Sequence, residues 1–337
     1  MEEKVNDSMK VGSKKWWGRQ LRDNNSAMIL VVLVIVAFAF IDGFNKTYYQ
    51  AILTAAEYGL VCLGLGMIMM TGNIDLSLGY LATSCGVTFV TVINAMYAAT
   101  GSVGISFLVA LLVALVLGVV LGAFNGFIIT RIGISPLIAT IATNYIFDGY
   151  VLQYASDSYK PESAAKEMVK AVGNTQIFGL KWLTPMTLIL LACIVLCALW
   201  MYKTRFGNSI KLVGDNAEAA NFAGISANHV VFVTYVITGL LCGLSGFLMV
   251  SYTGAAIYTQ GTALSTLPVA CCVLGGIKMT GGKGTAAHIL IGVLIMRIIS
   301  QMMNAAHLQT AIVNFVTGAL LIVILLIDRF TSTKEAE

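Results

Sequence analysis

The chain has 337 residues, of which 58% are hydrophobic and 11% charged, with a formal net charge of +4. Soluble domains carry about 25% charged residues, so the composition excludes a soluble fold and predicts an integral membrane protein. The apolar runs continue for ~15–20 residues without period-two alternation, which favours membrane helices over a β-barrel. All seven cysteines lie inside apolar runs without metal-ligand spacing. We interpret them as small buried hydrophobic residues and expect no metal site.

The first 26 residues form a basic tail with Trp16 and Trp17, which is typical of a cytoplasmic segment lying against anionic headgroups. The rest of the chain predicts an all-α, polytopic transmembrane bundle of about ten spans. The spans are expected near residues 27–41, 51–71, 78–98, 103–129, 134–154, 183–202, 230–252, 263–277, 286–304 and 309–327. The run 263–277 contains Pro268 and ends in two glycines, so we expect a short or broken helix there. Broken helices at membrane depth usually line a pathway.

Charge placement predicts the orientation of the spans. With the N-terminus inside, fourteen Lys and Arg residues fall on the inner side and five on the outer side. The positive-inside rule then places the tails 1–26 and 330–337, on either side of the membrane domain 27–329, in the cytoplasm. Spans two to five and seven to ten would enter from opposite sides, as an inverted repeat requires.

The segment 203–229 is the one long polar run between two blocks of apolar segments. It contains Arg205 and the sequence Glu218-Ala219-Ala220, followed by Gly224, which has the pattern of a short amphipathic helix that ends at a glycine, with Asn216 as a cap. Such a helix on the inner membrane face suits contact with a partner, and an ordinary solvated loop is the alternative. The outer segment 155–181 likewise fits either a partner contact or a solvated loop with one short helix.

Two inner turns carry unusual residues. In the turn 72–77, Asp75 or Ser77 could cap the following span, and the alternative is a gate or a partner contact, for which Asn73 is also a candidate. The second turn, 275–285, has five glycines: Gly275, Gly276, Gly281, Gly282 and Gly284. It is not a phosphate-binding loop, because a glycine follows Lys283 where that motif needs Ser or Thr, and no strand precedes it. We expect a tight inter-helix turn, and neither a nucleotide site nor a cofactor in this chain.

Charged and polar residues also interrupt the apolar runs. Glu57, Asp148, Arg297 and His307 are expected near the outer ends of spans, where an unpaired charge needs a partner or water. Arg297 fits an ion pair with either acid. In the same span as Asp148, Asn144 and Tyr145 would offer hydrogen bonds and a stacking face to a polar ligand, and interhelical bonding is the alternative for Asn144.

Several of these motifs resemble the permease subunits of bacterial ATP-binding-cassette importers for simple sugars, of the ribose, galactose and xylose type. The resemblance covers residues 50 to 329. It rests on Gly72–Gly79, Asn125-Gly126, Ser135-Pro136 with Ala139-Thr140, Thr204–Gly207, Gly214–Ala220 with Gly224-Ile225, and Leu274–Gly276 with Gly281–Gly284. Here Ala263–Pro268 replaces an acidic pair that family members usually carry before the Leu-Gly-Gly sequence.

The resemblance implies a membrane pore with no chemistry of its own, located in a bacterial cytoplasmic membrane. The segment from Glu218 to Gly224 would dock into a groove of a separate ATPase subunit, which binds the ATP and magnesium. A second permease subunit, identical or different, would complete the pore, and an extracytoplasmic binding protein would deliver the sugar. No nucleic-acid partner is implied.

Other functions remain open from the sequence. The solute could be a nucleoside or another small polar molecule. A secondary transporter would use Glu57 and Asp148 as proton-carrying carboxylates. A membrane enzyme has little support, because the sequence offers no His/Glu metal pattern and no nucleophile with a base.

Overall fold

The computed structural model describes residues 44–155, 158–309, 311–313, 315–319 and 322. The expected first span 27–41 and both terminal tails lie outside these residues, and the last expected span, 309–327, is described only in part. Within the described part, six helices are long and apolar enough to cross a membrane: the segments 48–70, 78–100, 103–132, 185–203, 227–253 and 286–305. An all-α membrane bundle is therefore confirmed, whereas the count of ten spans stays a prediction.

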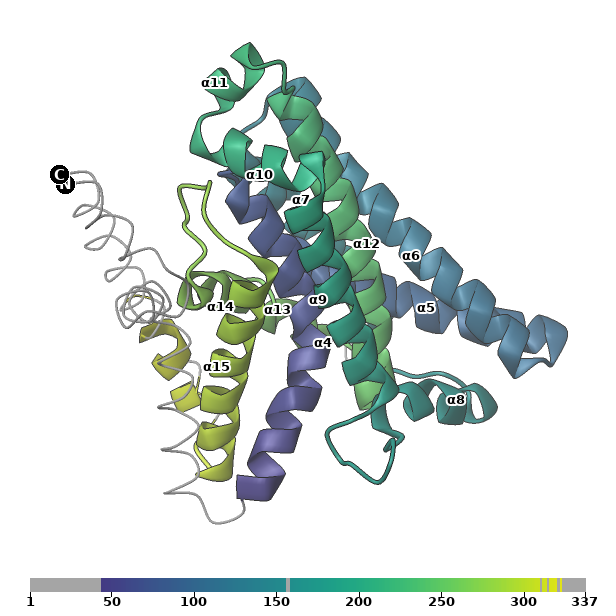
Figure 1. Cartoon of the computed structure of the whole chain (residues 1–337). Helices are drawn as coiled ribbons and strands as arrows, with labels where there is room; N and C mark the ends of the chain where they lie inside the picture. Colours follow the sequence, from purple (N-terminus) through teal and green to yellow (C-terminus); the bar gives the residue numbers. More distant parts are fainter. Residues whose placement is uncertain (1–43, 156–157, 310, 314, 320–321, 323–337) are drawn as a thin grey trace.

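The helices follow one another through turns and a few longer loops (Figure 1). In chain order they are α4 (Phe44–Met70), α5 (Leu78–Thr100), α6 (Val103–Phe127) with the π-helical turn η1 (Ile128–Ile132), α7 (Pro136–Ala155), α8 (Ser163–Asn174), α9 (Pro185–Lys203), α10 (Arg205–Asp215), α11 (Ala217–Phe222), α12 (Ala227–Thr253), α13 (Tyr258–Ala263), α14 (Leu267–Gly275) and α15 (Ala286–Ala305). Two short strands, β1 (Ser158–Tyr159) and β2 (Ala256–Ile257), form an antiparallel pair.

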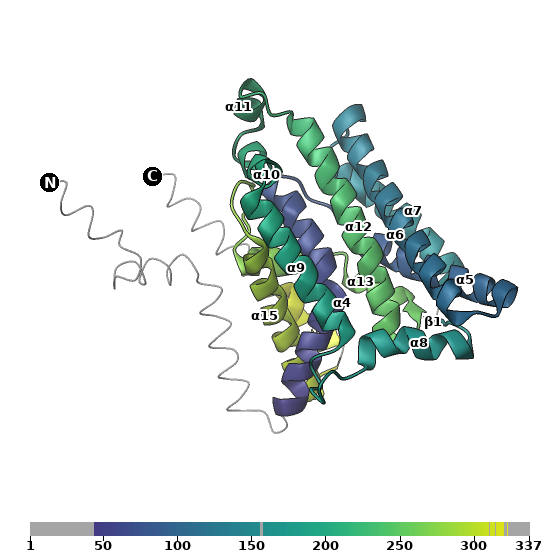
Figure 2. The ribbon, with the colours of Figure 1, turned by 45° about the vertical axis from the view of Figure 1, so that its right-hand side comes forward.

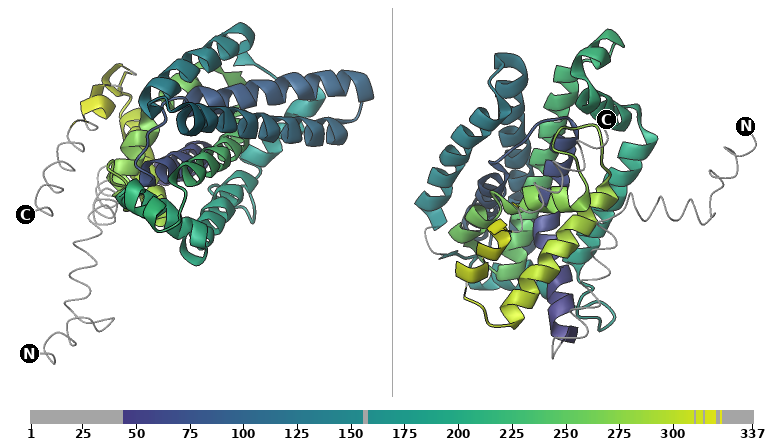
Figure 3. Two further views of the ribbon diagram at one scale, coloured as in Figure 1. Left: turned by 90° about the horizontal axis from the view of Figure 1, so that it is seen from above. Right: turned by 90° about the vertical axis from the view of Figure 1, so that its left-hand side faces the viewer.

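Helix α12 lies at the centre of the bundle. It contacts α4, α5 and α6, and Figure 2 shows it between α4, α9 and α15 on one side and α5, α6 and α7 on the other. The view from above in Figure 3 shows the same order, with α5 and α6 projecting away from the remaining helices. Helix α12 therefore connects the group formed by α4, α9 and α15 with the group formed by α5, α6 and α7.

Glycines permit the close approach of α12 to α6. A Cβ atom on Gly118 or Gly122 of α6 would overlap the backbone of α12 at Gly239. Gly118 and Gly122 are four residues apart, as are Gly239 and Gly243 of α12. Small residues at this spacing let membrane helices pack backbone to backbone, where van der Waals contact replaces the hydrophobic effect. The glycines therefore bring α6 and α12 into direct backbone contact.

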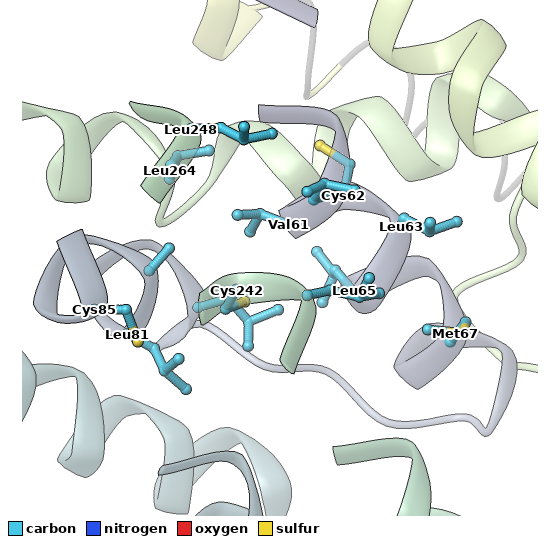
Figure 4. Packing of buried hydrophobic residues seen from close by; sticks show 14 of the residues in the cluster. Val61, Cys62, Leu63, Leu65, Met67, Leu81, Cys85, Cys242, Leu248 and Leu264 are labelled. Carbon is cyan, nitrogen blue, oxygen red and sulfur yellow. The ribbon is translucent and has the colours of Figure 1, made fainter. Parts of the chain in front are cut away.

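The core lies where α4, α5 and α12 meet. Figure 4 shows Val61 of α4, Leu81 of α5 and Leu248 of α12 among the packed side chains, and these are fully or almost fully buried. Cys62, Cys85, Cys242, Cys271 and Cys272 are buried as free thiols, while Cys193 and Cys197 are partly exposed. The described residues hold no cluster of metal-binding side chains. Five of the cysteines are therefore the buried apolar residues that we expected.

The expected short or broken span is confirmed as two short helices. α13 ends at Ala263, and α14 begins at Leu267 with Pro268 in its first turn, where proline gives up no helical hydrogen bond. Gly276 ends α14 in the left-handed conformation with φ of 97°. The chain thus runs from α12 through β2 and α13 before α14 packs against α15.

The two ends of the bundle carry different elements. α10 and α11 lie at one end and α8 at the opposite end (Figure 1). The polar segments 203–229 and 155–181 therefore lie on opposite faces, as the charge pattern predicts. The outer segment contains the one short helix that the second alternative expects, α8, which packs against α12 and buries Ala165 and Val169.

Candidate functional site

The most buried acidic side chain of the spans, Glu57, lies halfway along α4. Its Oε1 accepts a hydrogen bond of 2.8 Å from Nε2 of Gln260 in α13, and its backbone carbonyl accepts one of 2.7 Å from Oγ of Ser245 in α12. The expectation that Glu57 lies near the outer end of its span is wrong, because α4 begins at Phe44 instead of residue 51. Glu57 instead joins α4 to α12 through its backbone carbonyl and to α13 through its carboxylate.

Arg297 approaches the same place from α15. Its guanidinium carbon lies 4.3 Å from the centre of the Tyr58 ring, an arrangement that stabilises the cation through the ring face. Its charge also acts on Glu57. Neither of the two expected ion pairs appears among the described residues, and the buried Nε of Arg297 has no hydrogen-bond partner there. His307 lies apart from this cluster, beyond the end of α15, and is exposed.

A second polar group joins α5, α7 and α13. The hydroxyls of Tyr80 and Thr262 are 2.9 Å apart, and the Tyr80 and Tyr258 rings pack with centroids separated by 5.6 Å. The Tyr258 hydroxyl also interacts with the Asp148 carboxylate of α7. The structure thus brings Asp148 to the same short helix, α13, that contacts Glu57.

The two other candidates on α7 have different surroundings. Asn144 is half-buried, and its Oδ1 atom has no hydrogen-bond partner among the described residues. Tyr145 is 70% exposed, and no contact joins it to this cluster of side chains among the described residues. Asn144 therefore belongs with Asp148, four residues further along the same face, whereas Tyr145 does not.

The turn between α4 and α5 is held by a hydrogen-bond network around Asp75. Its Oδ1 accepts hydrogen bonds of 2.7 Å from both the backbone nitrogen and Oγ of Ser77, and Asn125 of α6 donates 2.8 Å to the Ser77 hydroxyl. Burial raises the pKa of Asp75 to about 6, although these donors oppose the rise. Ser77 precedes α5 but makes no side-chain cap, so the simple capping interpretation is wrong. Asn73 only bonds locally to Thr71.

The glycine-rich turn 275–285 packs against the inner ends of other helices. The backbone nitrogen of Gly282 donates a hydrogen bond of 3.0 Å to the carbonyl of Met70, the last residue of α4. A Cβ atom on Gly281 would crowd the backbones of Gly72 and Gly214, and one on Gly282 would overlap Asp215 of α10. Gly275 comes equally close to the backbone of α15 at His288. The interpretation as a tight inter-helix turn with close backbone approach is confirmed.

The helix expected around Glu218 is present as α11. Oδ1 of Asn216 caps it by accepting a hydrogen bond of 2.9 Å from the nitrogen of Ala219. At its other end, Gly224 has φ of 82° and bonds to the Asn221 carbonyl, and Ile225 bonds back to the Ala220 carbonyl. These two bonds form a Schellman motif, which requires a left-handed residue and explains the glycine.

Side-chain exposure on α11 corrects one expectation. Ala220 is only 5% exposed and packs inside the chain, so it offers no surface to a partner. Glu218, Ala219 and Gly224 are exposed, as is Arg205 at the start of α10. Phe222, which the sequence interpretation missed, is 86% exposed. Its signal in the sequence is a single aromatic residue within an otherwise small and polar run.

Comparison with known proteins gives the family. The family model for the permease component of branched-chain amino acid transport systems matches residues 47–325 of this chain. The chain belongs to this permease family. It is 30% identical to the ribose import permease protein of Bacillus subtilis over 89% of this chain and 90% of the relative.

Two further relatives have comparable coverage. The L-arabinose transport system permease protein of Escherichia coli K12 is 29% identical over 93% of this chain and 92% of its own. The autoinducer 2 import system permease protein of Photorhabdus luminescens is 26% identical over 94% of this chain and 92% of its own. The family resemblance seen in the sequence motifs is thereby confirmed, and this member is a transmembrane transport permease of the ATP-binding-cassette class.

Proposed function

We propose that this chain forms the translocation pathway of an importer for a simple sugar, driven by a separate ATPase subunit. The observation that carries the proposal is α11, a short helix fixed at both ends by its caps, which presents Glu218, Ala219 and Phe222 outward at the end of the bundle opposite α8. A rigid, solvent-facing helix with one large apolar side chain suits insertion into a groove of a partner.

The contacts of α10 and α11 suggest how force from a partner would enter the bundle. α11 packs on α12, and the Asn221 side chain accepts a hydrogen bond of 2.9 Å from the nitrogen of Ala227, the first residue of α12. α10 packs on α4, at Gly214 against Met70. A shift of α10 and α11 would therefore act on α4 and α12, which carry Glu57 and Ser245. ATP and magnesium would be bound by the partner, and the chain itself would catalyse no reaction.

The remaining partners and the topology complete the proposal. The segment 155–181 would face an extracytoplasmic binding protein, both termini would lie in the cytoplasm, and the chain would pair with a second permease in the bacterial cytoplasmic membrane. We also infer ten spans in an inverted repeat, from the number of apolar runs and the placement of charge between them. The solutes in the relatives' names, ribose, L-arabinose and autoinducer 2, favour a small hydroxylated molecule.

Reconstitution tests the proposal directly. The purified chain, its ATPase and its binding protein are placed in liposomes, and uptake of radiolabelled ribose and L-arabinose is followed with and without ATP. We expect uptake that requires all three components and ATP. Uptake by the chain alone under a proton gradient would instead establish the secondary transporter, and ATP-dependent uptake of a nucleoside in place of both sugars would reassign the solute.

A further inference from the structure

Polar contacts join helix α13 to three other helices. Gln260 bonds to Glu57 of α4, Thr262 lies at 2.9 Å from the hydroxyl of Tyr80 in α5, and Tyr258 interacts with Asp148 of α7. The helix has six residues, and its sequence, YTQGTA, offers little apolar surface to bury. An element with few apolar contacts opens locally at lower free energy than the surrounding core. Breaking a few hydrogen bonds would therefore release α13 without unpacking the bundle.

Helix α7, which packs against α13, holds two polar atoms that lack partners among the described residues. Oδ1 of Asn144 and Oδ1 of Asp148 are buried, and neither has a hydrogen-bond partner among the described residues. The two residues are four apart and so lie on one helix face. Buried polar atoms are almost always hydrogen-bonded, so two orphans side by side require an explanation. Both are acceptors, which means that the missing group must be a donor.

We propose that Asn144 and Asp148 form a binding site for the hydroxyl groups of a neutral, hydroxyl-rich solute, and that α13 closes this site in the present conformation. This inference rests on the proposed function, and the two residues would be the part of the pathway that recognises the solute. Solute hydroxyls would satisfy both oxygens, and the paired rings of Tyr80 and Tyr258 would offer an apolar face to the C–H groups of a sugar. An anionic solute is excluded by repulsion from the Asp148 carboxylate.

Thiol accessibility tests whether α13 closes the site. Asn144→Cys is made in a full-length chain whose native cysteines are replaced by alanine, and membranes carrying the assembled complex are treated with a small, charged methanethiosulfonate. We expect slow labelling, which Gln260→Leu accelerates ~10-fold or more, because the hydrogen bond to the Glu57 carboxylate is lost. Ser265→Ala is the matched control, since the Ser265 hydroxyl bonds only to the carbonyl of Gly261 within the same segment.

A second variant guards against misfolding of the first. Gln260→Met conserves the length of the side chain but offers no N–H donor to Glu57, so α13 should be released in the same way. Equal labelling rates in the parent, Gln260→Leu and Gln260→Met would show that α13 does not cover Asn144. That outcome would overturn the proposal.

Solute protection tests the ligand class. In the Gln260→Leu background, where Asp148 remains to bind a solute hydroxyl beside the reporter thiol, we expect high concentrations of ribose, L-arabinose, xylose and sorbitol to slow the labelling of Asn144→Cys, while ribose 5-phosphate and lysine have no effect. Protection by lysine, equal protection by ribose 5-phosphate, or no protection by any neutral polyol would refute a hydroxyl-binding site. Co-purification of the ATPase with the parent chain reports separately on the importer assignment, so each idea can fail without the other.

Discussion

The exposed Phe222 of α11 gives the sharpest test of partner binding. The side chain is 86% exposed in the isolated chain, so a groove that covers it would bury nearly a whole phenyl ring. Burial of such a side chain stabilises a complex by ~1.5–3 kcal/mol. We therefore expect Phe222→Ala to weaken binding of the ATPase subunit ~10- to 150-fold, with a matching loss of coupled ATP hydrolysis.

A matched control lies on the opposite face. Phe178, between α8 and α9, is 91% exposed, so Phe178→Ala removes the same apolar surface without touching α11. The assay is titration of the purified chain, in lipid nanodiscs, with the ATPase subunit. Equal affinities for parent, Phe222→Ala and Phe178→Ala would mean that Phe222 rests in lipid headgroups and that α11 is not the docking element. Ala220→Trp is unsuitable here, because Ala220 is buried inside the chain and a large side chain would disturb its own packing.

Three further predictions concern the inner turns and the topology. Burial raises the pKa of Asp75 from its ordinary 3.8 to about 6, so folding disfavours its charge by ~3 kcal/mol at neutral pH, and stability should rise as the pH falls from about 6 to about 4. Asp75→Asn should remove this pH dependence in thermal unfolding, and a pH profile like that of the parent would contradict the assignment to Asp75. Asp75→Ala leaves the backbone nitrogen and the hydroxyl of Ser77 unpaired and should destabilise the fold by ~1–3 kcal/mol for each lost acceptor. Gly282→Ala should destabilise the fold by ~1–3 kcal/mol and lower the unfolding temperature, because Gly282 has a φ of 77° and a Cβ atom there would overlap Asp215 of α10. Gly149→Ala is the control, since open space surrounds Gly149, and equal unfolding temperatures for the two variants would refute the argument. In intact cells, an impermeant thiol reagent should label Phe178→Cys but not Ala219→Cys, and the reverse pattern would invert the topology.

Features that depend on neighbouring residues could be predicted from the sequence. Asn216 and Gly224 were recognised as the ends of α11, because caps act within one helical turn. Pro268 and Gly276 likewise indicated a short α14. The same holds for the close backbone approach in the glycine-rich turn, since glycine is the residue that permits left-handed angles and contact without a Cβ atom.

Features that depend on the rotation of one helix against another could not be predicted. Gln260 bonds to Glu57, 203 positions away in the chain. Nothing in the apolar run around Glu57 indicates which face of α4 turns toward the other helices. The same limit explains Ala220, which looked like a surface residue in a polar segment but packs inside the chain. Arg297 was expected to pair with an acid, and only the position of α15 relative to α4 brings it to the ring of Tyr58 instead.

The placement of α12 connects the two parts of the candidate site. The helix begins beside α11, where Asn221 holds its first residue, holds the backbone of Glu57 through Ser245, and leads through β2 into α13. Its 27 residues span about 40 Å, which is enough to reach from one membrane face to the other. A packed helix transmits displacement along its length because its backbone bonds resist bending. A partner that shifts α11 therefore acts, through α12, on the contacts that hold α13 over Asn144 and Asp148.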